Sequence, residues 1–363
     1  MNFFSAFLIS FVLSVVLIPV NMVFARKFGL VDDPKKRTHP AILHKIAVPR
    51  AGGLAIYLAV VLTVFLTLGL TKQLLGIILG GLVLIVVGLV DDKIDIKKSW
   101  IKILAQILAA LIVVGSGIGV SFIGNPFHLF GLGAASSVIR FDSLKIVFDF
   151  LGVHSIVVWA DLFAIFWIVW VINMVNFSAG VDGQLPGIAT IVLFVIFAIS
   201  LRFSATDPSQ ILVAKLALAG VGATLGFLIY NYNPAKIFPG DSGSYFLGFL
   251  IATLSILSGA KVGTALLVMA VPLIDGVFTV IRRLADGKSP FLGDRKHLHH
   301  RLMEIGLTQA QVAVIYWLFC TILGIIALTI GADMKVFAGI VVVIIVLGGI
   351  LWLNTNLPNT GRE

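Results

Sequence analysis

The chain has 363 residues, of which 59% are apolar and only 12% are charged, and its mean hydropathy is +1.10. Soluble domains are about 45–50% apolar and about 25% charged, so this composition excludes an ordinary soluble protein. The formal net charge of +9 is explained first by membrane orientation, because cytoplasmic loops collect Lys and Arg. Nucleic acid is therefore not implied as a partner. The single Cys320 lies in an apolar run, which excludes a disulfide framework.

Apolar stretches near 20 residues long recur along the chain, and a helix of that length crosses about 30 Å of hydrocarbon. The predicted fold class is an all-α polytopic integral membrane protein, with one transmembrane domain over residues 1–363. The first stretch lacks a basic start and a cleavage site, so it is predicted to be a retained helix and not a signal peptide. About eleven transmembrane helices are expected, at residues 3–24, 50–70, 74–90, 100–118, 157–175, 186–203, 210–230, 243–259, 263–281, 313–331 and 336–353.

The basic residues divide unevenly between the two sets of alternate loops. One set of loops and span edges holds 19 of them and the other holds six. The positive-inside rule then predicts an external N-terminus and a cytoplasmic C-terminus. Residues 282–312 become a His- and Arg-rich cytoplasmic loop, and residues 119–156 become an external loop that forms a small hairpin or an amphipathic cover. Five of the seven histidines and most acids also fall on the cytoplasmic side, which the rule does not require, so this face is expected to carry the chemistry.

An acidic cluster follows the third apolar stretch, in GLVDDKIDI at residues 88–96. Asp91, Asp92 and Asp95 are clustered like charges at a membrane edge, where carboxylates are costly to desolvate. Such a group suits Mg²⁺, which prefers oxygen ligands and keeps several waters. The alternative is a solvated loop that ends the helix, with the lysines nearby neutralising the acids.

A second polar segment, NMVNFSAGVDGQLPG at residues 173–187, leaves a Trp-rich span. Asn173 and Asn176 are three residues apart, so they share one helix face, and Asp182 follows among glycines that permit close approach to a ligand. The alternative is a glycine-rich turn with Asn as a helix cap. Amides on one face beside an acid favour a ligand site.

The third segment, NYNPAKIFPGDSGSYFLG at residues 231–248, is typical of a polar turn that opens a helix. Either Asp241 or Ser242 is a candidate N-cap, which would be a purely structural role. In the functional interpretation the helix N-terminus offers backbone N–H groups to a phosphate while Asp241 holds a metal ion on it.

The fourth segment, GDRKHLHHRLMEIG at residues 293–306, combines basic residues with three imidazoles. His297, His300 and Arg301 can share a helix face by their spacing. Zinc is disfavoured because closed zinc sites want a fourth ligand and Cys is missing here. A phosphate is the favoured guest, since Arg forks match its oxygens; a solvated basic loop is the alternative. Together the four segments predict phosphoryl transfer from a charged soluble donor, with the second substrate in the lipid.

These motifs, in this order, resemble those of the polyprenyl-phosphate N-acetylhexosamine-1-phosphate transferases. The matching stretches are GLVDDPKKR, HKIAVPRAGGLAIY, LVDDKIDI, KILAQ, NMVNFSAGVDG, FPGDSGSYFLG and RKHLHHRL, between residues 29 and 302. The family includes the WecA and TagO enzymes, the MraY translocase and the eukaryotic dolichyl-phosphate GlcNAc-1-phosphate transferase. The resemblance implies ten or eleven helices, dependence on Mg²⁺ with Mn²⁺ as a possible substitute, and transfer of a sugar 1-phosphate from a UDP-sugar to a polyprenyl phosphate with release of UMP.

The resemblance also implies roles for individual residues. Many bacterial members have an acid where this chain has Ala179, so Asp182 carries over only the role of the acid that remains. By the same match the catalytic group is Asp91, Asp92, Asp182 and His300, and Asn176 and Asp241 are the metal ligands. Phe238 and Gly180 bracket uracil, Lys102 contacts phosphate, and the remaining substrate-binding residues are His297, His299 and Arg301.

The HLHHR segment at residues 297–301 is similar to that of the WecA and TagO branch. The expected reaction is therefore transfer of GlcNAc 1-phosphate from UDP-GlcNAc, or a related UDP-N-acetylhexosamine, to undecaprenyl phosphate at the cytoplasmic face of the bacterial inner membrane. The alternatives are an MraY-type transferase of phospho-MurNAc-pentapeptide and a lipid-phosphate transporter. A homodimer is a possible assembly.

Overall fold

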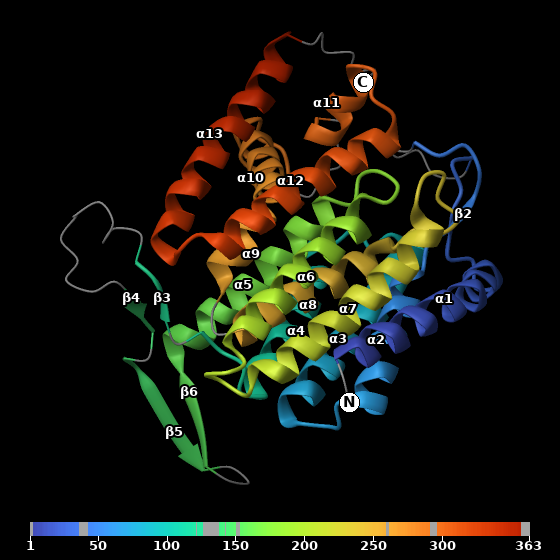
Figure 1. Ribbon diagram of the computed structural model, residues 1–363. Helices are drawn as coiled ribbons and strands as arrows, with labels where there is room; N and C mark the ends of the chain where they lie inside the picture. The colour runs from blue at the N-terminus through green and yellow to red at the C-terminus, as the bar shows by residue number, and fades with distance from the viewer. Residues whose placement is uncertain are drawn as a thin grey trace.

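The structure, a computed structural model, is a bundle of helices joined at both ends by loops and short antiparallel strand pairs (Figure 1). It describes residues 3–35, 43–120, 122–125, 138–141, 143–149, 153–258, 261–290 and 296–356. The helices are α1 (Phe3–Lys27), α2 (Gly52–Thr67), α3 (Lys72–Ile94), α4 (Ser99–Gly115), α5 (Val158–Phe177), α6 (Gln184–Phe203), α7 (Gln210–Asn231), α8 (Gly240–Leu257), α9 (Val262–Val268), α10 (Ala270–Ala285), α11 (Leu298–Glu304), α12 (Gln309–Thr329) and α13 (Ala332–Asn356). The strands are β1 (Val31–Asp32), β2 (Val48–Pro49), β3 (Phe122–Gly124), β4 (Val138–Arg140), β5 (Lys145–Asp149) and β6 (Val153–Val157).

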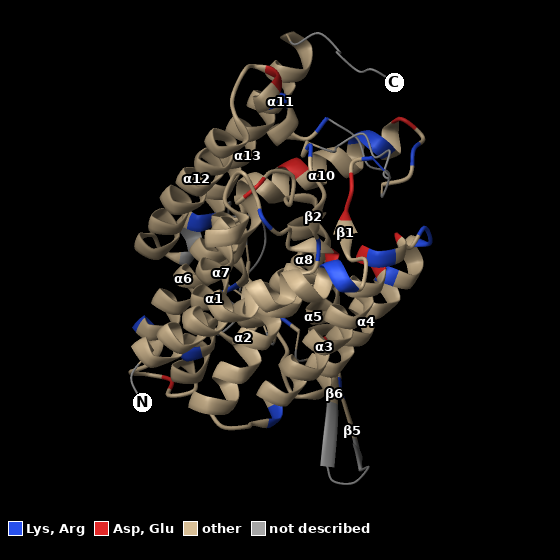
Figure 2. Cartoon of the chain, turned by 90° about the vertical axis from the view of Figure 1, so that its right-hand side faces the viewer, with Lys and Arg blue, Asp and Glu red and all other residues tan. Residues whose placement is uncertain are grey.

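Charged residues are concentrated at one end of the bundle, around β1, β2, α10 and α11, and the middle has few of them (Figure 2). This end is called the β1–β2 end, and the opposite one, where β5 and β6 project, the hairpin end. Helix α1 starts at the hairpin end, and α13 finishes near α11 at the β1–β2 end (Figures 1 and 2). The first and last described residues therefore lie at opposite ends of the bundle.

Eight of the described helices are long and apolar enough to cross a membrane, and α9 with α10 makes a ninth if the bent pair counts as one span. The apolar helices α2 and α4, with 16 and 17 residues, fall short of that length. The polytopic helical class is therefore confirmed, whereas the count of eleven spans and their orientation stay predictions. Large exposed apolar side chains on α1 and α13 form a surface suited to lipid: Val12, Val16, Val20, Val341, Ile344 and Ile345.

The span predicted as one helix over residues 263–281 is instead broken. Helices α9 and α10 meet at Met269 and are bent by 82°. Pro272 explains the position of the break, because a proline lacks the N–H that would bond to the residue four before it, and its ring clashes with that carbonyl. That residue is Val268, where α9 ends. Pro272 then lies in the first turn of α10, where no intrahelical N–H bond is needed.

The predicted external loop contains β-hairpins, as one of its two interpretations proposed. Strands β3 and β4 pair antiparallel with Ile123 opposite Ile139, and β5 pairs with β6 with Val147 opposite Ser155. Residues 126–137 of this loop lie outside the described residues, as does His39. Within the predicted loop 282–312, the structure places the short helix α11 and the start of α12.

Helix α8 lies at the centre of the bundle, packed against α3 and α5 (Figure 1). Of its apolar window 83% is buried inside the protein, the highest share among the span-length helices described. Its N-terminus points to the β1–β2 end, where it meets the ends of α3 and α5. The first turn of this central helix therefore lies at the charged end of the bundle.

Candidate active site

The N-terminus of α8 is capped by a side chain from another helix. Asp92, near the end of α3, accepts hydrogen bonds from the backbone N–H groups of Asp241 (2.7 Å) and Ser242 (3.2 Å) and from the Ser242 hydroxyl (2.9 Å). Asp241 and Ser242 were candidate N-caps from the sequence, and that prediction is wrong. These two N–H groups were expected to face a phosphate, but both donate to Asp92. The Asp241 carboxylate therefore does not cap α8, and it lines a cavity instead.

Glycines allow α2 and α3 to approach the start of α8 closely enough for this contact. A Cβ on Gly88 would collide with Ser242, and one on Gly53 would collide with Gly243. Asp92 is one helical turn beyond Gly88 and so points to the same side of α3. Small residues at these positions let the carboxylate of one helix reach the backbone of the next.

The predicted metal ligands are brought together. The Asn176 side-chain amide donates to Asp241 Oδ1 at 2.9 Å and to the Ser244 hydroxyl at 2.7 Å. Asn176 lies in the last turn of α5 and Asp241 in the first turn of α8. Two residues 65 positions apart in the chain thus present oxygen-bearing groups to the same point.

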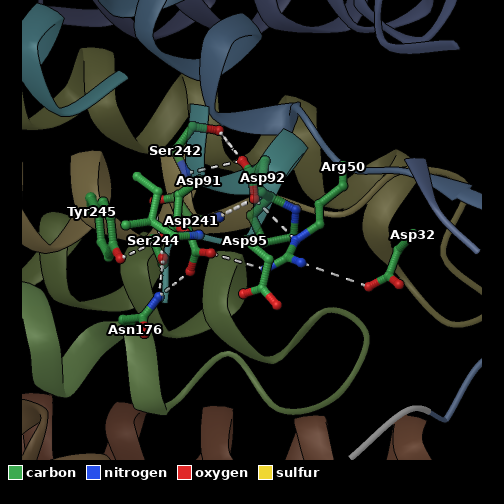
Figure 3. A network of polar contacts seen from close by, with 12 residues as sticks. Asp32, Arg50, Asp91, Asp92, Asp95, Asn176, Asp241, Ser242, Ser244 and Tyr245 are labelled. Carbon is green, nitrogen blue, oxygen red and sulfur yellow. Dashed lines mark hydrogen bonds and ion pairs between the residues drawn. The ribbon is translucent and has the colours of Figure 1, made fainter. Parts of the chain in front are cut away.

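Arg50 joins three of the carboxylates at this point (Figure 3). Its Nε lies 3.0 Å from Asp92 Oδ1, its Nη2 lies 3.0 Å from Asp241 Oδ2, and its Nη1 lies 3.9 Å from Asp32 Oδ2. Burial by itself lowers the pKa of Arg50, but the surrounding carboxylates together raise it above its usual range. The guanidinium therefore stays charged and fixes Asp92 and Asp241 relative to each other.

Asp91, the neighbour of Asp92 in α3, has three partners of its own. Lys102 Nζ lies 2.7 Å from its Oδ2, the Tyr245 hydroxyl donates to Oδ2 at 3.2 Å, and the Ile96 N–H donates to Oδ1 at 2.8 Å. The predicted phosphate contact of Lys102 is thus an ion pair with Asp91 in this structure, and its contact with substrate stays a prediction. Asp95, the third acid, pairs with exposed Lys97.

The ionic network of described residues carries more acid than base. Four carboxylates (Asp32, Asp91, Asp92 and Asp241) share two cations (Arg50 and Lys102). The formal excess of two negative charges, with carboxylate and amide oxygens at Asp241 and Asn176, matches the charge and the ligand preference of a divalent cation such as Mg²⁺. The residues present therefore fit the expected metal.

A cavity of about 300 Å³ opens beside Asn176 and Asp241. Gly180 and Phe238, the predicted uracil pair, both line it, as does Asp182. The Asp182 carboxylate accepts hydrogen bonds from Asn233 Nδ2 (2.9 Å) and from the Ala235 N–H (3.0 Å). Asp182 thus fixes the α7–α8 loop that forms one wall, and its catalytic role stays a prediction.

The histidine segment packs against this cavity through His299. A Cβ on Gly180 would collide with the His299 ring, so the α5–α6 turn and α11 are in close contact. His299 stacks on His297 with 5.3 Å between ring centroids. Burial lowers the pKa of His299 well below 6.5, and neighbouring His300 and His297 lower it further. The ring is therefore neutral at neutral pH.

His297 is held from both ring nitrogens. Its Nδ1 lies 3.1 Å from Asp275 Oδ2 and its Nε2 lies 3.3 Å from Arg283 Nη2. Asp275, His297 and His299 also place potential ligand atoms within 4.8 Å of one another, an arrangement that could hold a metal ion. The Arg283 guanidinium beside His297 opposes a second cation there, and the arrangement favours an imidazole fixed by hydrogen bonds.

The structure separates Arg301 from the cavity. Its Nε donates to Asn354 Oδ1 at 2.9 Å and its Nη1 donates to Glu304 Oε2 at 2.7 Å, so it ties α11 to the end of α13. His300 is buried with its ring centroid 4.3 Å from that of His299. Neither Arg301 nor His300 is among the described residues that line the cavity, and their roles toward substrate stay predictions.

A second, apolar cavity of about 460 Å³ lies between α4, α5 and α10. Its lining includes Ile107, Phe166, Trp170 and Val280, with Asn173 at its edge. Asn173 donates to Gln106 Oε1 at 2.6 Å. Because Asn173 and Asn176 are one turn apart on α5, the apolar and the polar cavities lie near each other along that helix.

Sequence reasoning missed several residues at the site. Arg50 was quoted only as part of a motif, yet Arg50 and His44 are the basic residues among the described ones that line the polar cavity. The signal was the Gly52–Gly53 pair that follows Arg50, which indicates close backbone approach. Asp275 and Arg283, which hold His297, lie in an apolar-to-basic helix and carried no such signal.

Comparison with known proteins identifies the group to which this site belongs. The sequence model described as Glycosyl transferase family 4 matches residues 74–259, just over half of the chain. The chain belongs to glycosyl transferase family 4. That match contains the acidic pair of α3, Asn176 and Asp241, so the carboxylates around the start of α8 are part of the family's shared region.

Individual relatives of the family extend the match to most of the chain. A Bacillus subtilis protein named probable undecaprenyl-phosphate N-acetylglucosaminyl 1-phosphate transferase is 31% identical over 89% of this chain and 83% of its own length. A Mycobacterium tuberculosis decaprenyl-phosphate N-acetylglucosaminephosphotransferase is 30% identical over 88% and 78%. The Escherichia coli K12 undecaprenyl-phosphate alpha-N-acetylglucosaminyl 1-phosphate transferase is 30% identical over 82% and 76%. The resemblance inferred from the motifs is confirmed.

Proposed function

We propose that this protein transfers GlcNAc 1-phosphate from UDP-GlcNAc to undecaprenyl phosphate and releases UMP. The observation that carries the proposal is the Asn176–Asp241 pair at the wall of a polar cavity, beside a network with an excess of two negative charges. The names of the relatives, all polyprenyl-phosphate GlcNAc 1-phosphate transferases, support the same transferred group and the same class of acceptor.

The polar cavity takes the nucleotide part of the donor. Its volume of about 300 Å³ lies at the lower end of the range of small-molecule sites. Phe238 and Gly180 then bracket uracil from the two sides of the cavity, and His299 supports Gly180 from behind. The diphosphate points to Asn176 and Asp241, with Arg50 as the nearest cation on the wall.

Asn176 and Asp241 would hold Mg²⁺, and the Asn176 amide would rotate to present its oxygen. Bound there, the ion would neutralise the diphosphate and favour departure of UMP. The protein's own part is to keep Asp241 in place through Arg50 on one oxygen, while the bond from the Asn176 N–H to the other oxygen would give way to the ion. Asp92 contributes by fixing the backbone from which Asp241 projects.

The apolar cavity between α4, α5 and α10 accepts the start of the polyprenyl chain. Its walls are almost wholly apolar, and it adjoins the polar cavity along α5. A lipid seated there has its phosphate near Asn173 and Lys102, at the edge of the polar site. A phosphomonoester has a second pKa near 6 and is largely a dianion at neutral pH, so it needs little help to attack.

Asp91 and Asp92 therefore contribute more by charge and position than by removing a proton. Asp91 would hold Lys102 at the acceptor phosphate, since the two form an ion pair of 2.7 Å. Asp182 shapes the donor cavity through the α7–α8 loop. His300 and Arg301 would act on substrate only after α11 moves toward the cavity, and His297 and His299 keep α11 seated against Gly180.

The test is release of UMP by the purified protein with undecaprenyl phosphate and a panel of UDP-sugars. UDP-GlcNAc is expected to be the best donor, and UDP-glucose is expected to be poor by orders of magnitude, because polar groups that recognise the N-acetyl group are left unpaired. A preference for UDP-MurNAc-pentapeptide would favour the MraY-type alternative. Lipid movement without UMP release would favour the transporter.

A further inference from the structure

Three basic side chains meet at the hairpin end of the bundle, far from the candidate active site. Arg202 lies in the last turn of α6, Lys261 directly precedes α9, and Lys335 lies in the first turn of α13. These positions are between 59 and 133 residues apart in the sequence. Their meeting is therefore a product of the fold.

Short contacts connect the three residues through their chain neighbours Thr264 and Phe203. Lys335 Nζ donates to Thr264 Oγ1 at 2.8 Å, in the first turn of α9 beside Lys261. Lys261 Nζ lies 3.9 Å from the centroid of the Phe203 ring, next to Arg202. Arg202 and Lys261 both repel the Lys335 ammonium electrostatically. The three cations are therefore near enough to influence one another electrostatically.

No ion pair joins these three side chains to a carboxylate among the side chains that the structure describes. Asp207, in the adjacent α6–α7 turn, instead accepts hydrogen bonds from Ser209 and Gln210. Those bonds lower the pKa of Asp207. Its carboxylate is therefore stabilised by its own turn and does not pair with the cluster. Among the described side chains, no carboxylate therefore neutralises the cluster.

The cluster is also on the unexpected side of the membrane. It contains three of the six basic residues that fall in the set of loops predicted to be external, the side on which Lys and Arg are depleted. Large apolar side chains next to it are exposed: Leu201, Phe203, Met334 and Phe337. Cations that border an exposed apolar surface suit an amphiphile with an anionic head.

We propose that Arg202, Lys261 and Lys335 bind the phosphate group of an anionic lipid headgroup at the external membrane surface. The phosphate accepts from the Arg202 guanidinium and the two ammonium groups, and the acyl chains lie along α6 and α13. A free phosphate ion would satisfy the cations but would leave the adjoining apolar surface unused. The site is independent of the transferase reaction.

The experiment measures lipid binding to the purified full-length protein by native mass spectrometry, with phosphatidylglycerol or phosphatidylcholine titrated into the detergent. The variant combines Arg202→Gln, Lys261→Gln and Lys335→Gln. Its affinity for phosphatidylglycerol is expected to fall about a hundredfold, because three cations are removed and each cation near an anionic lipid contributes about fivefold. The matched control combines Lys72→Gln, Arg140→Gln and Lys145→Gln, which remove the same charge from the same end and should change the affinity less than twofold.

Three outcomes would overturn the proposal. Equal affinities of the wild type and the cluster variant for phosphatidylglycerol overturn the proposal, as does equally tight binding of phosphatidylcholine. Displacement of phosphatidylglycerol by millimolar inorganic phosphate would identify a site for the free ion and also overturn it. If the triple variant fails to fold, Arg202→Gln alone replaces it, because this side chain is exposed and tolerates change. The double variant Lys261→Arg and Lys335→Arg keeps both charges and should retain wild-type affinity.

Discussion

Asp241 is held on both of its oxygens, by the Asn176 amide at 2.9 Å and by the Arg50 guanidinium at 3.0 Å. Its backbone N–H is occupied by Asp92. This division explains why a carboxylate in the first turn of a helix, a common capping position, is free to face a cavity. At the scale of single residues, the capping role and the proposed ligand role belong to two different aspartates.

Removal of the Asp241 charge is expected to lower UMP release about a hundredfold or more, since one preorganised electrostatic contact to a transition state has that magnitude. Asp241→Asn keeps the size and one oxygen and isolates the charge. Binding of Mn²⁺ to the purified protein, followed by electron paramagnetic resonance, should weaken in parallel. Asp207→Asn, an exposed change at the opposite end, is the control; full activity of Asp241→Asn or of wild type in excess chelator would contradict the assignment.

Arg50 is expected to be required for stability as well as activity. Arg50→Gln leaves the Asp92 carboxylate, with 0% of its side chain exposed, without its counter-ion, and breaking a buried pair costs about 3–5 kcal/mol. Arg50→Lys restores a charge but not the two-sided fork that reaches Asp92 and Asp241 together. The melting temperature in detergent should therefore fall in the order wild type, Arg50→Lys, Arg50→Gln. Arg26→Gln, an exposed arginine, should melt like the wild type.

The buried His299 predicts a loss of stability in acid. Its pKa is lowered by burial in the folded state, so below the ordinary value of about 6.5 the unfolded chain binds a proton that the folded protein does not. The free energy of unfolding is then not reduced by His299 above pH 6.5, and it decreases as the pH falls below that value. The melting temperature should drop more steeply between pH 7 and pH 5 in the wild type than in His299→Gln. Parallel pH profiles would contradict this origin.

At the scale of elements, the site depends on the close approach of α3 to the start of α8. Gly88→Ala is expected to push Ser242 away, because its Cβ would collide with the backbone there, and Asp92 would lose its contact with the Asp241 N–H. UMP release should fall by at least about tenfold, since misplacement by about 1 Å is enough to slow catalysis strongly. Gly339→Ala, which meets open space on α13, should retain wild-type activity.

Hydropathy predicted the apolar elements well because each is long and nearly uniform in composition. It missed the break at Met269 because Pro272 is one residue in an otherwise apolar run, and its effect falls four residues earlier. The family resemblance correctly implied that Asn176 and Asp241 lie together. It did not predict that Asp92 caps α8 or that Arg301 bonds Asn354, because these contacts depend on how distant helices pack and no local pattern encodes them.

At the scale of the whole molecule, the two ends of the bundle differ in charge and predict a fixed orientation. Cys320 is buried, so it gives little background for labelling with a membrane-impermeant maleimide in intact cells. Asp207→Cys, at the hairpin end, is expected to react, and Lys98→Cys, at the β1–β2 end, is expected to react only after the membrane is opened. Labelling of Lys98→Cys from outside would place the candidate active site on the external face and contradict the predicted orientation.

The central position of α8 has a consequence for how the protein is made. With a hydropathy of 1.2, α8 is the least apolar of the span-length helices described, and it carries buried Ser242, Ser244, Thr253 and Ser255. A segment of this kind partitions weakly into lipid by itself, because polar groups in hydrocarbon need partners. Its retention during biosynthesis then depends on α3 and α5, which are already inserted when the ribosome releases it. The same contacts that position Asp241 would thus decide whether a nascent chain matures or is degraded.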